Sequence, residues 1–551
     1  MERIFGCMRR PIFQSFTRGS KRKSIPNDGL SLEHFLLNPK HSDQIPTKAT
    51  PVPYINEIDL DGGGRRVFLD VKGCQMNVSD AEVVQSVLLK YGYKFTRDPA
   101  DAQIHLLVTC SIREGAENKV WRKLKNLSRD KRRLQGQLKI GILGCMAERL
   151  KEKFFQDPPL ADVVAGPDAY KDLPRLLNVS MMTDQSAINV ILSRDETYAD
   201  VLPVQLNADA VTAFVSIQRG CDNMCSYCIV PFTRGRERSR PISSILDEVR
   251  NLSGKGVKEI TLLGQNVNSY RDTTEASHFV SADARSSTSF KTVYKPKLGG
   301  ARFADLLDQV SRIDPEVRIR FTSPHPKDFP QPVLQLISER SNICKHIHLP
   351  AQAGSNTVLE SMRRGYTKES YLSLVQEIRS QIPSVTLSSD FIAGFCGESD
   401  EDFQETIDLI HRVQYNKMFV FPYSLREKTN AHRKLDDNVP EELKKKRFLE
   451  LYELEKTMSR QLNEKLLNSE QCVLIEGDSK RSPNDFQGRA DGNNKVIFPK
   501  DFNLKPGDYC TVHITHSNSA TLKGIIKEPT SLKLMSSCSS ALKPFQIGYN
   551  N

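Results

Sequence analysis

Short runs of alternating apolar and polar residues recur along the chain, and segments with a helical period separate many of them. Residues 211–217 alternate as a half-buried strand does, and a helical segment over 242–252 ends at Gly254. Further strand-like runs occupy 259–263, 317–322, 346–349, 385–392 and 417–421. Strands alternating with helices predict a parallel β/α barrel or partial barrel, which carries its reactive groups at the carboxyl ends of its strands.

Two flanking regions have different patterns. Upstream, strand-like runs at 67–71, 105–109 and 139–143 predict a small α/β domain over 65–180. Downstream, short alternating runs at 472–476, 495–498 and 509–515 predict a small β-barrel over 469–529. A connecting helix is expected within 438–468, where Pro440 and two acidic residues mark its start. The predicted β/α barrel then spans 207–437, with a surface insertion rich in Ser, Thr and Ala at 271–300.

The two ends of the chain are expected to lie outside these domains. The first 24 residues are rich in arginine, poor in acids and amphipathic, which is typical of a mitochondrial presequence. A disordered basic tail or a nuclear signal around Lys21-Arg22-Lys23 is the alternative. We therefore expect a presequence and flexible lead-in over 1–64 and a tail over 530–551. No apolar run in the 551 residues has the length of a membrane span.

Three closely spaced cysteines are the most informative chemical feature. Cys221, Cys225 and Cys228 stand in Gly220-Cys221-Asp222-Asn223-Met224-Cys225-Ser226-Tyr227-Cys228. Their spacing fits three corners of a cubane iron–sulfur cluster and leaves the fourth iron without a protein ligand. A chance grouping and a three-ligand zinc knuckle are the alternatives. An open iron predicts redox chemistry on a small molecule.

A second cysteine trio is more widely spaced. Cys74, Cys110 and Cys145 each follow one of the upstream strand-like runs. Ends of parallel strands converge at one edge of a sheet, so three thiolates meeting there would hold a second cluster. Ordinary buried thiols are the alternative.

These motifs carry a family resemblance. The CxxxCxxC spacing, with Tyr227 before its last cysteine, resembles the signature of radical S-adenosylmethionine enzymes. Together with Gly73-Cys74-Gln75-Met76-Asn77, Thr109-Cys110-Ser111 and Gly144-Cys145-Met146-Ala147, it resembles the MiaB-type tRNA methylthiotransferases from about residue 65 to 524, most of all their mitochondrial animal members. The resemblance implies an α/β chain with an N-terminal methylthiotransferase domain, a partial radical S-adenosylmethionine barrel and a C-terminal TRAM-like RNA-binding β-barrel.

The resemblance also implies cofactors and their contacts. It implies two [4Fe-4S] clusters, held by the six cysteines, and S-adenosylmethionine. The expected S-adenosylmethionine contacts are Tyr227, Gly264, Gln265, Ser323, Gln352, Asp390, Ile392 and Gly394. Two positions depart from the family pattern: Cys396 replaces a usual proline and Ala353 a common serine. Without the serine hydroxyl, we expect no polar role at position 353. We expect Cys396 to fill space in the core, and a thiol open to oxidation is the alternative.

A basic segment over 119–133 bears on the partner. It supplies eight cations against Asp130 alone and contains the only tryptophan, Trp121. Such a helix suits a phosphate backbone, and the indole suits base stacking. The alternative is a solvated helix face with Trp121 turned into the core. The net charge of +11 agrees with a polyanionic partner without identifying it.

The resemblance implies methylthio transfer to C2 of N6-isopentenyladenosine in a tRNA anticodon loop. One S-adenosylmethionine supplies the methyl group and another supplies an adenosyl radical, so no side chain is required as a general acid or base. Further implied partners are an electron donor and a sulfur source, and a monomer in the mitochondrion is expected, with cytoplasm or nucleus as the alternative. The rival activities are methylthiolation of a threonylcarbamoyladenosine or of a ribosomal protein. A further rival is a non-catalytic binding or regulatory protein on the same scaffold.

Overall fold

The computed structural model describes residues 60–112, 114–133, 137–156, 158–183, 185–274, 299–501 and 503–534. They belong to one compact unit over Asn56–Asn551. The predicted presequence, the middle of the predicted insertion at 275–298 and the end of the predicted tail at 535–551 lie outside the described residues. Among the described helices, none has both the length and the apolar character needed to span a bilayer.

The first domain is built on a parallel sheet. Its six strands lie in the order β2-β1-β3-β4-β5-β6, and every neighbouring pair is parallel. The expected runs at 67–71, 105–109 and 139–143 form the adjacent strands β1, β3 and β4. The strands are β1 (Arg66–Val71), β2 (Lys94–Phe95), β3 (Ile104–Thr109), β4 (Lys139–Gly144), β5 (Val163–Ala165) and β6 (Ala187–Asn189). The last strand lies beyond the limit of 180 expected for this domain.

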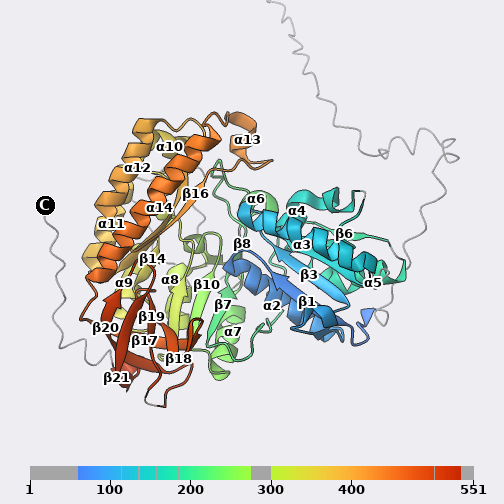
Figure 1. The fold of residues 1–551 in the computed structure, drawn as a ribbon, viewed down its shortest axis with the longest axis horizontal. Coiled ribbons are helices and arrows are strands. Elements are labelled where there is room, and N and C mark those ends of the chain that lie inside the picture. Colours follow the sequence, from blue (N-terminus) through green and yellow to red (C-terminus); the bar gives the residue numbers. More distant parts are fainter. Residues whose placement is uncertain are drawn as a thin grey trace, which may run out of the picture. The chain divides into compact units, whose positions relative to one another are not determined.

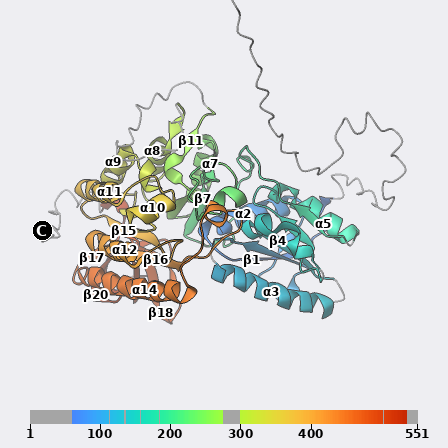
Figure 2. The ribbon, with the colours of Figure 1, turned by 90° about the horizontal axis from the view of Figure 1, so that it is seen from above.

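Helices cover both faces of this sheet (Figure 1). On one face lie α2 (Gln75–Lys90) and α5 (Leu173–Met182). On the other lies α3 (Glu114–Arg133), whose Val120, Leu124 and Leu127 are buried against the sheet. Figure 2 shows α3 running along the sheet. Shorter helical segments are η3 (Pro99–Asp101), α4 (Cys145–Leu150), η4 (Lys151–Phe155) and η5 (Tyr170–Asp172).

The second domain is the predicted partial barrel. Its strands β7 (Thr212–Ser216), β10 (Glu259–Leu263) and β13 (Arg318–Phe321) form one parallel sheet. A second parallel sheet contains β14 (His346–His348), β15 (Thr386–Ala393) and β16 (Lys417–Pro422). A parallel bridge between Ile319 and Ile343 joins the two sheets. Because every pairing is parallel, all the carboxyl ends lie at the same rim of the barrel.

Helices of the barrel pack on its outer side, as the view in Figure 1 shows for α11 (Lys368–Gln381) and α12 (Asp400–Val413). The helical segments are α6 (Val230–Thr233), α7 (Ile242–Gly254), η6 (Val267–Ser269), α8 (Phe303–Ser311), η7 (Pro326–Asp328), α9 (Gln331–Glu339), α10 (Asn356–Ser361), α11 (Lys368–Gln381), α12 (Asp400–Val413) and α13 (Asn430–Lys434). Two antiparallel ribbons complete the domain: β8 (Gln218–Arg219) with β9 (Arg238–Ser239), and β11 (Arg271–Asp272) with β12 (Ala301–Arg302). The second ribbon brings the two ends of the predicted insertion together.

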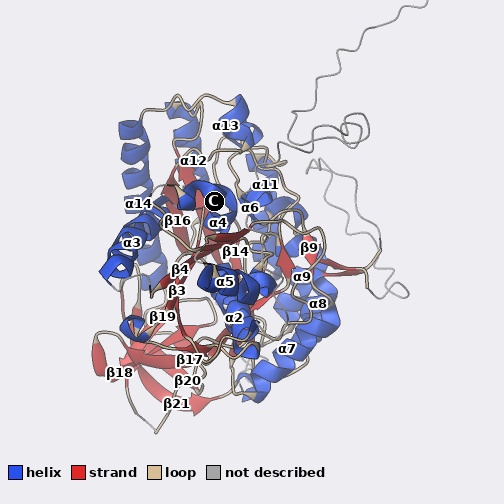
Figure 3. Cartoon of the chain, turned by 90° about the vertical axis from the view of Figure 1, so that its right-hand side faces the viewer, coloured by secondary structure: helices blue, strands red, loops and turns tan. Residues whose placement is uncertain are grey.

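A long helix, α14 (Glu441–Glu464), leads to the third domain. Five strands close there into a barrel, visible as the group of β17 to β21 in Figure 3. They are β17 (Glu470–Ser479), β18 (Ser482–Ala490), β19 (Lys495–Pro499), β20 (Tyr509–Ser517) and β21 (Leu522–Thr530). The predicted small β-barrel is thereby confirmed.

Two buried arginines fix this β-barrel to the partial barrel. Arg318 donates to the carbonyls of Arg489 and Cys472, both at 2.7 Å. Arg320 donates to the carbonyls of Asp491 and Ala490, both at 2.9 Å. Since β13 begins at Arg318, these contacts lie at the amino ends of the barrel strands, away from the rim that carries the cysteines.

Candidate metal centres

The upstream cysteines lie at the carboxyl ends of three adjacent strands. Cys110 follows β3 directly, Cys145 is the first residue of α4, and Cys74 immediately precedes α2. The register pairs Val71 with Val108 and Thr109 with Gly144, so these strand ends are level. The order of strands reverses between β1 and β3, and open α/β sheets bind their ligands at such a switch point.

Contacts between the side chains show that this trio converges. A hydrogen bond joins the side chains of Cys74 and Cys110, and Cys145 lies within electrostatic reach of Cys74. Gly73 has a φ of +127°, and a Cβ there would lie 2.5 Å from Cβ of Cys110. Only glycine allows the first strand end to approach the second so closely.

The second trio lies on the loop that follows β8. The backbone N–H of Asn223 donates to Sγ of Cys221 at 3.4 Å. The Cys228 N–H donates to the Cys225 carbonyl at 3.1 Å, which makes a tight turn between these two cysteines. Gly220, with a φ of +75°, enters the loop where a Cβ would lie 2.0 Å from the Arg236 carbonyl oxygen. Backbone contacts therefore shape the loop that carries the three cysteines.

Each trio offers a donor set of thiols alone, which suits iron–sulfur clusters. In the part of the chain that the structure describes, no three His, Cys, Asp or Glu side chains gather tightly enough to hold a single ion. A cluster has a different requirement, because each cysteine binds a different iron. The residues of both trios therefore fit a cluster better than they fit one zinc ion.

Burial controls the protonation of these thiols. Burial raises the pKa values of Cys145 and Cys221 and raises that of Cys228 to about 12. The hydrogen bond with Cys110 lowers the pKa of Cys74 to about 6. Metal ligation requires thiolates, so cluster assembly must release protons from the buried thiols.

The expected S-adenosylmethionine contacts all lie at the carboxyl rim of the barrel or in the cysteine loop. Tyr227 belongs to the cysteine loop, and its ring meets that of Phe395 edge-on at 6.5 Å. Gly264 and Gln265 follow β10, and Ser323 follows β13. Gln352 follows β14 and bridges to Phe391 of β15. Asp390 and Ile392 are in β15, which Gly394 directly follows.

Backbone strain marks two of these positions. Ser323 has a φ of +58° and Gln352 a φ of +74°, in the left-handed region that non-glycine residues seldom adopt. Such strain gathers at ligand sites, where the surrounding structure enforces it. Gln265 is held differently: its Oε1 accepts the N–H of Gly220 at 2.6 Å, which couples β10 to the cysteine loop.

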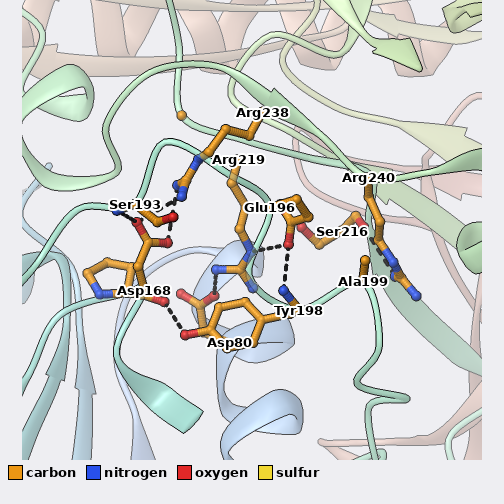
Figure 4. Close-up of polar contacts among 12 residues, drawn as sticks. Asp80, Asp168, Ser193, Glu196, Tyr198, Ala199, Ser216, Arg219, Arg238 and Arg240 are labelled. Carbon is orange, nitrogen blue, oxygen red and sulfur yellow. Dashed lines mark hydrogen bonds and ion pairs between the residues drawn. The ribbon is translucent and has the colours of Figure 1, made fainter. Parts of the chain in front are cut away.

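Sequence reasoning missed a buried ionic network between the first two domains. Arg219 donates to Asp80 at 2.9 Å, and its guanidinium lies 4.6 Å from the centre of the Tyr198 ring. Arg238 pairs with Asp168 at 2.9 Å. Figure 4 shows these side chains pointing toward one another. The cluster of arginines after Cys228 was the available signal, yet a single sequence does not reveal that most of them are buried.

Trp121 takes the second of its two expected roles. Its ring packs against the core of the first domain, 5.3 Å from the ring of Phe154. The cations of α3 at Lys119, Arg122, Lys125 and Arg129 are exposed. The helix thus combines a core face with a basic outer face.

The two departures from the family pattern lie in the core. Cys396 is 6% exposed and Ala353 fully buried, both among the barrel's apolar side chains. Burial raises the pKa of Cys396. These positions agree with the filler role expected for Cys396.

Comparisons with known proteins cover all three domains. Residues 66–166 match the uncharacterized protein family UPF0004, residues 215–410 the radical SAM superfamily, and residues 464–527 the TRAM domain. The mouse protein named mitochondrial tRNA methylthiotransferase CDK5RAP1 is 54% identical, over 92% of this chain and 89% of its own length. Its human counterpart is 53% identical over 95% and 89%.

Bacterial relatives extend the match. A protein of Chloroherpeton thalassium named tRNA-2-methylthio-N(6)-dimethylallyladenosine synthase is 45% identical, over 83% of this chain and 95% of its own length. Alignments of this length include both cysteine-bearing domains and the small β-barrel. The chain therefore belongs to the family of radical SAM tRNA methylthiotransferases that includes CDK5RAP1.

Proposed function

We propose that this protein adds a methylthio group to C2 of N6-isopentenyladenosine in tRNA and uses S-adenosylmethionine to do so. The observation that carries the proposal is the convergence of two cysteine trios at the carboxyl ends of two parallel sheets within one chain. The names of the relatives support this substrate over a threonylcarbamoyladenosine or a ribosomal protein. They also support a mitochondrial location.

S-adenosylmethionine and a [4Fe-4S] cluster follow from membership of the radical SAM superfamily. Cys221, Cys225 and Cys228 are the proposed ligands, and the bound cluster would supply the electron that cleaves S-adenosylmethionine. The left-handed backbone at Ser323 and Gln352 supports their assignment to the cofactor site. Asp390, Ile392 and Gly394 of the next strand end would complete it. An external electron donor is required.

A second [4Fe-4S] cluster is proposed at Cys74, Cys110 and Cys145. Its support is the convergence of the three thiols at the switch point of the first sheet, together with the Ile112 N–H that donates to Sγ of Cys110 at 3.4 Å. This cluster would hold the sulfur that is transferred, and a separate sulfur source must replenish it. The protein's part is to keep this site close to the barrel rim, which the contacts of Asp80 with Arg219 and Arg234 support.

Two surfaces are proposed to hold the tRNA. One is the basic outer face of α3, which begins shortly after Cys110 and so extends from the second cluster site. The other is the TRAM β-barrel, on the opposite end of the barrel strands. Phosphate contacts position an RNA without reading its sequence, and the target base must leave its stack to reach the rim. We propose that one chain suffices, so gel filtration should show a monomer.

Iron and sulfide analysis of anaerobically purified protein tests the cofactors, and mass spectrometry of tRNA from cells with and without the protein tests the product. Cys225→Ala should abolish cleavage of S-adenosylmethionine. Cys110→Ala should retain some cleavage but lose methylthiolation. Cys472→Ser, a change outside both trios, is the matched control. Unchanged methylthiolation by Cys110→Ala would contradict the second cluster, and unchanged cleavage by Cys225→Ala would contradict the first. Absence of both reactions in the cluster-loaded wild type would support a non-catalytic protein.

A further inference from the structure

A guanidinium from the barrel contacts the cysteine trio of the first domain. Arg234 follows α6, in the segment after Cys228, and its Nε donates to Sγ of Cys145 at 3.2 Å. The arginine is 3% exposed. A residue of the radical SAM domain therefore places a positive charge against a ligand of the second cluster, where little water screens it.

Asp80 fixes that guanidinium in place. Its carboxylate is fully buried and accepts Nη2 of Arg234 at 2.6 Å and Nη1 of Arg219 at 2.9 Å. Asn77, whose Nδ2 donates to the carbonyl of Lys72, accepts a further contact from Arg234 at 3.4 Å. Glu196 lies 3.9 Å from Nε of Arg219, so the two carboxylates balance the two guanidinium groups. The charge that contacts the sulfur directly is nevertheless the positive one of Arg234.

The other trio has the same arrangement from a different arginine. Arg364, 4% exposed, donates from Nη1 to Sγ of Cys225 at 3.4 Å. Its remaining donors reach the hydroxyl of Tyr366 at 2.9 Å and the carbonyl of Pro350 at 2.8 Å. Each trio thus has its own buried arginine on one sulfur, held by groups that do not contact the other trio.

We propose that Arg234 is a positioning residue that raises the reduction potential of the cluster at Cys74, Cys110 and Cys145. Reduction adds negative charge to a cluster, and an N–H···S hydrogen bond from a cation stabilises the more negative state. Asp80 offsets part of that effect while it keeps the guanidinium on Cys145. The inference rests on the second cluster of the proposed function. It makes the potentials of the two clusters separately adjustable, one through Arg234 and one through Arg364.

The test is a redox titration of the full chain, reconstituted anaerobically and monitored by electron paramagnetic resonance. Cys110→Ala and Cys225→Ala should each lose one cluster, and so they assign the two signals. In Arg234→Gln, the equilibrium constant for reduction of the second cluster should fall at least tenfold, about 59 mV for one electron. The other cluster should keep its potential. Arg364→Gln is the matched variant and should lower the reduction potential of the other cluster instead.

Further variants separate tuning from folding. Arg234→Lys keeps the charge and should remain closer to the wild-type potential than Arg234→Gln at equal iron content. Asp80→Asn removes the offsetting negative charge and should raise the reduction potential of the second cluster. This change is opposite in sign to that expected for Arg234→Gln, and loosened packing does not predict it. If Arg234→Gln does not bind the second cluster, the direction in which Asp80→Asn shifts that cluster's reduction potential tests the inference.

Three results would overturn the inference: an unchanged second potential in Arg234→Gln with full iron, an equal shift of both clusters, or a fall or no change in Asp80→Asn. Iron analysis of the wild type distinguishes this failure from that of the proposed function. If the wild type binds only one cluster, the second cluster of the proposed function is wrong. If it binds two clusters and Arg234→Gln leaves the potential unchanged, only the role of Arg234 is wrong.

Discussion

Arg447 of α14 donates from Nη1 to Oε1 of Glu398 at 2.8 Å, and both side chains are buried. The same carboxylate oxygen accepts the N–H of Gly394 at 2.9 Å. Because Gly394 has a φ of +74° at the end of β15, this acceptor fixes a turn that glycine alone adopts readily. The helix that leads to the TRAM domain therefore holds the rim where S-adenosylmethionine is proposed to bind.

Arg447→Met should both destabilise the protein and weaken S-adenosylmethionine binding. Removing one partner of a buried ion pair costs about 3–5 kcal/mol, because the other charge stays buried and unpaired. Denaturant unfolding measures the first effect and equilibrium binding to the cluster-loaded protein the second. Arg412→Met is the control: its pair with Asp408 is exposed, so the loss should stay within about 1 kcal/mol. Equal effects of the two variants would contradict the role given to Arg447.

Charge reversal on α3 should weaken tRNA binding. Arg122 and Lys125 are exposed on the outer face of the helix, so the variant with Arg122→Glu and Lys125→Glu keeps the core face intact. For every phosphate that the variant no longer neutralises, the slope of log affinity against log salt should fall by about 1. Binding measured over a series of salt concentrations checks this. The charge-matched variant with Lys445→Glu and Lys446→Glu on α14 should bind tRNA more tightly than the α3 variant does. Equal losses of affinity in the two variants would count against a specific α3 surface.

Substitutions of Trp121 should separate its two expected roles by experiment. The indole packs on Phe154 in the core, so Trp121→Phe should bind tRNA as the wild type does. Trp121→Ala should lower the unfolding free energy by about 3 kcal/mol through the cavity it leaves. Thermal unfolding and tRNA affinity, measured on both variants, check this. A loss of affinity in Trp121→Phe at normal stability would restore the base-stacking role.

Glu82 should make stability fall with rising pH. Burial raises the pKa of this α2 carboxyl from 4.5 to about 8, so the folded state prefers the neutral acid. The stabilisation is complete below about pH 4.5 and is lost as pH rises toward about 8. Each tenfold difference in proton affinity is worth about 1.4 kcal/mol. In Glu82→Gln, the unfolding free energy should therefore depend less on pH across this window, and above it the variant should be more stable than the wild type. Glu453→Gln, at an exposed site, should leave the pH dependence of the unfolding free energy unchanged.

The sequence anticipated most elements because their signals are local. The strand-like run at 259–263 predicted β10 with its observed bounds, and the runs before Cys74, Cys110 and Cys145 became three neighbouring strands. Such signals are local: β7 alternates because one face is buried, whereas a short apolar run such as that of β10 suits a strand buried on both faces. The spacing of Cys221, Cys225 and Cys228 was likewise enough to predict a cluster loop.

The buried charges needed the tertiary structure. Arg234, Asp80, Arg364 and Arg447 look in sequence like ordinary surface residues, because burial and pairing arise from elements far apart in the chain. Asp80 is 154 positions from Arg234, and no periodicity links the two. The side of Trp121 was also undecided, since a basic helix with one aromatic residue fits either orientation.

By itself, the sequence determined the three domains, the two cysteine trios and the family to which they belong. Only the folded chain decided which sulfur meets which guanidinium and how the first domain and α14 contact the barrel. The physical reason is range: periodicity and ligand spacing act between near neighbours, whereas desolvated ion pairs depend on where whole elements pack.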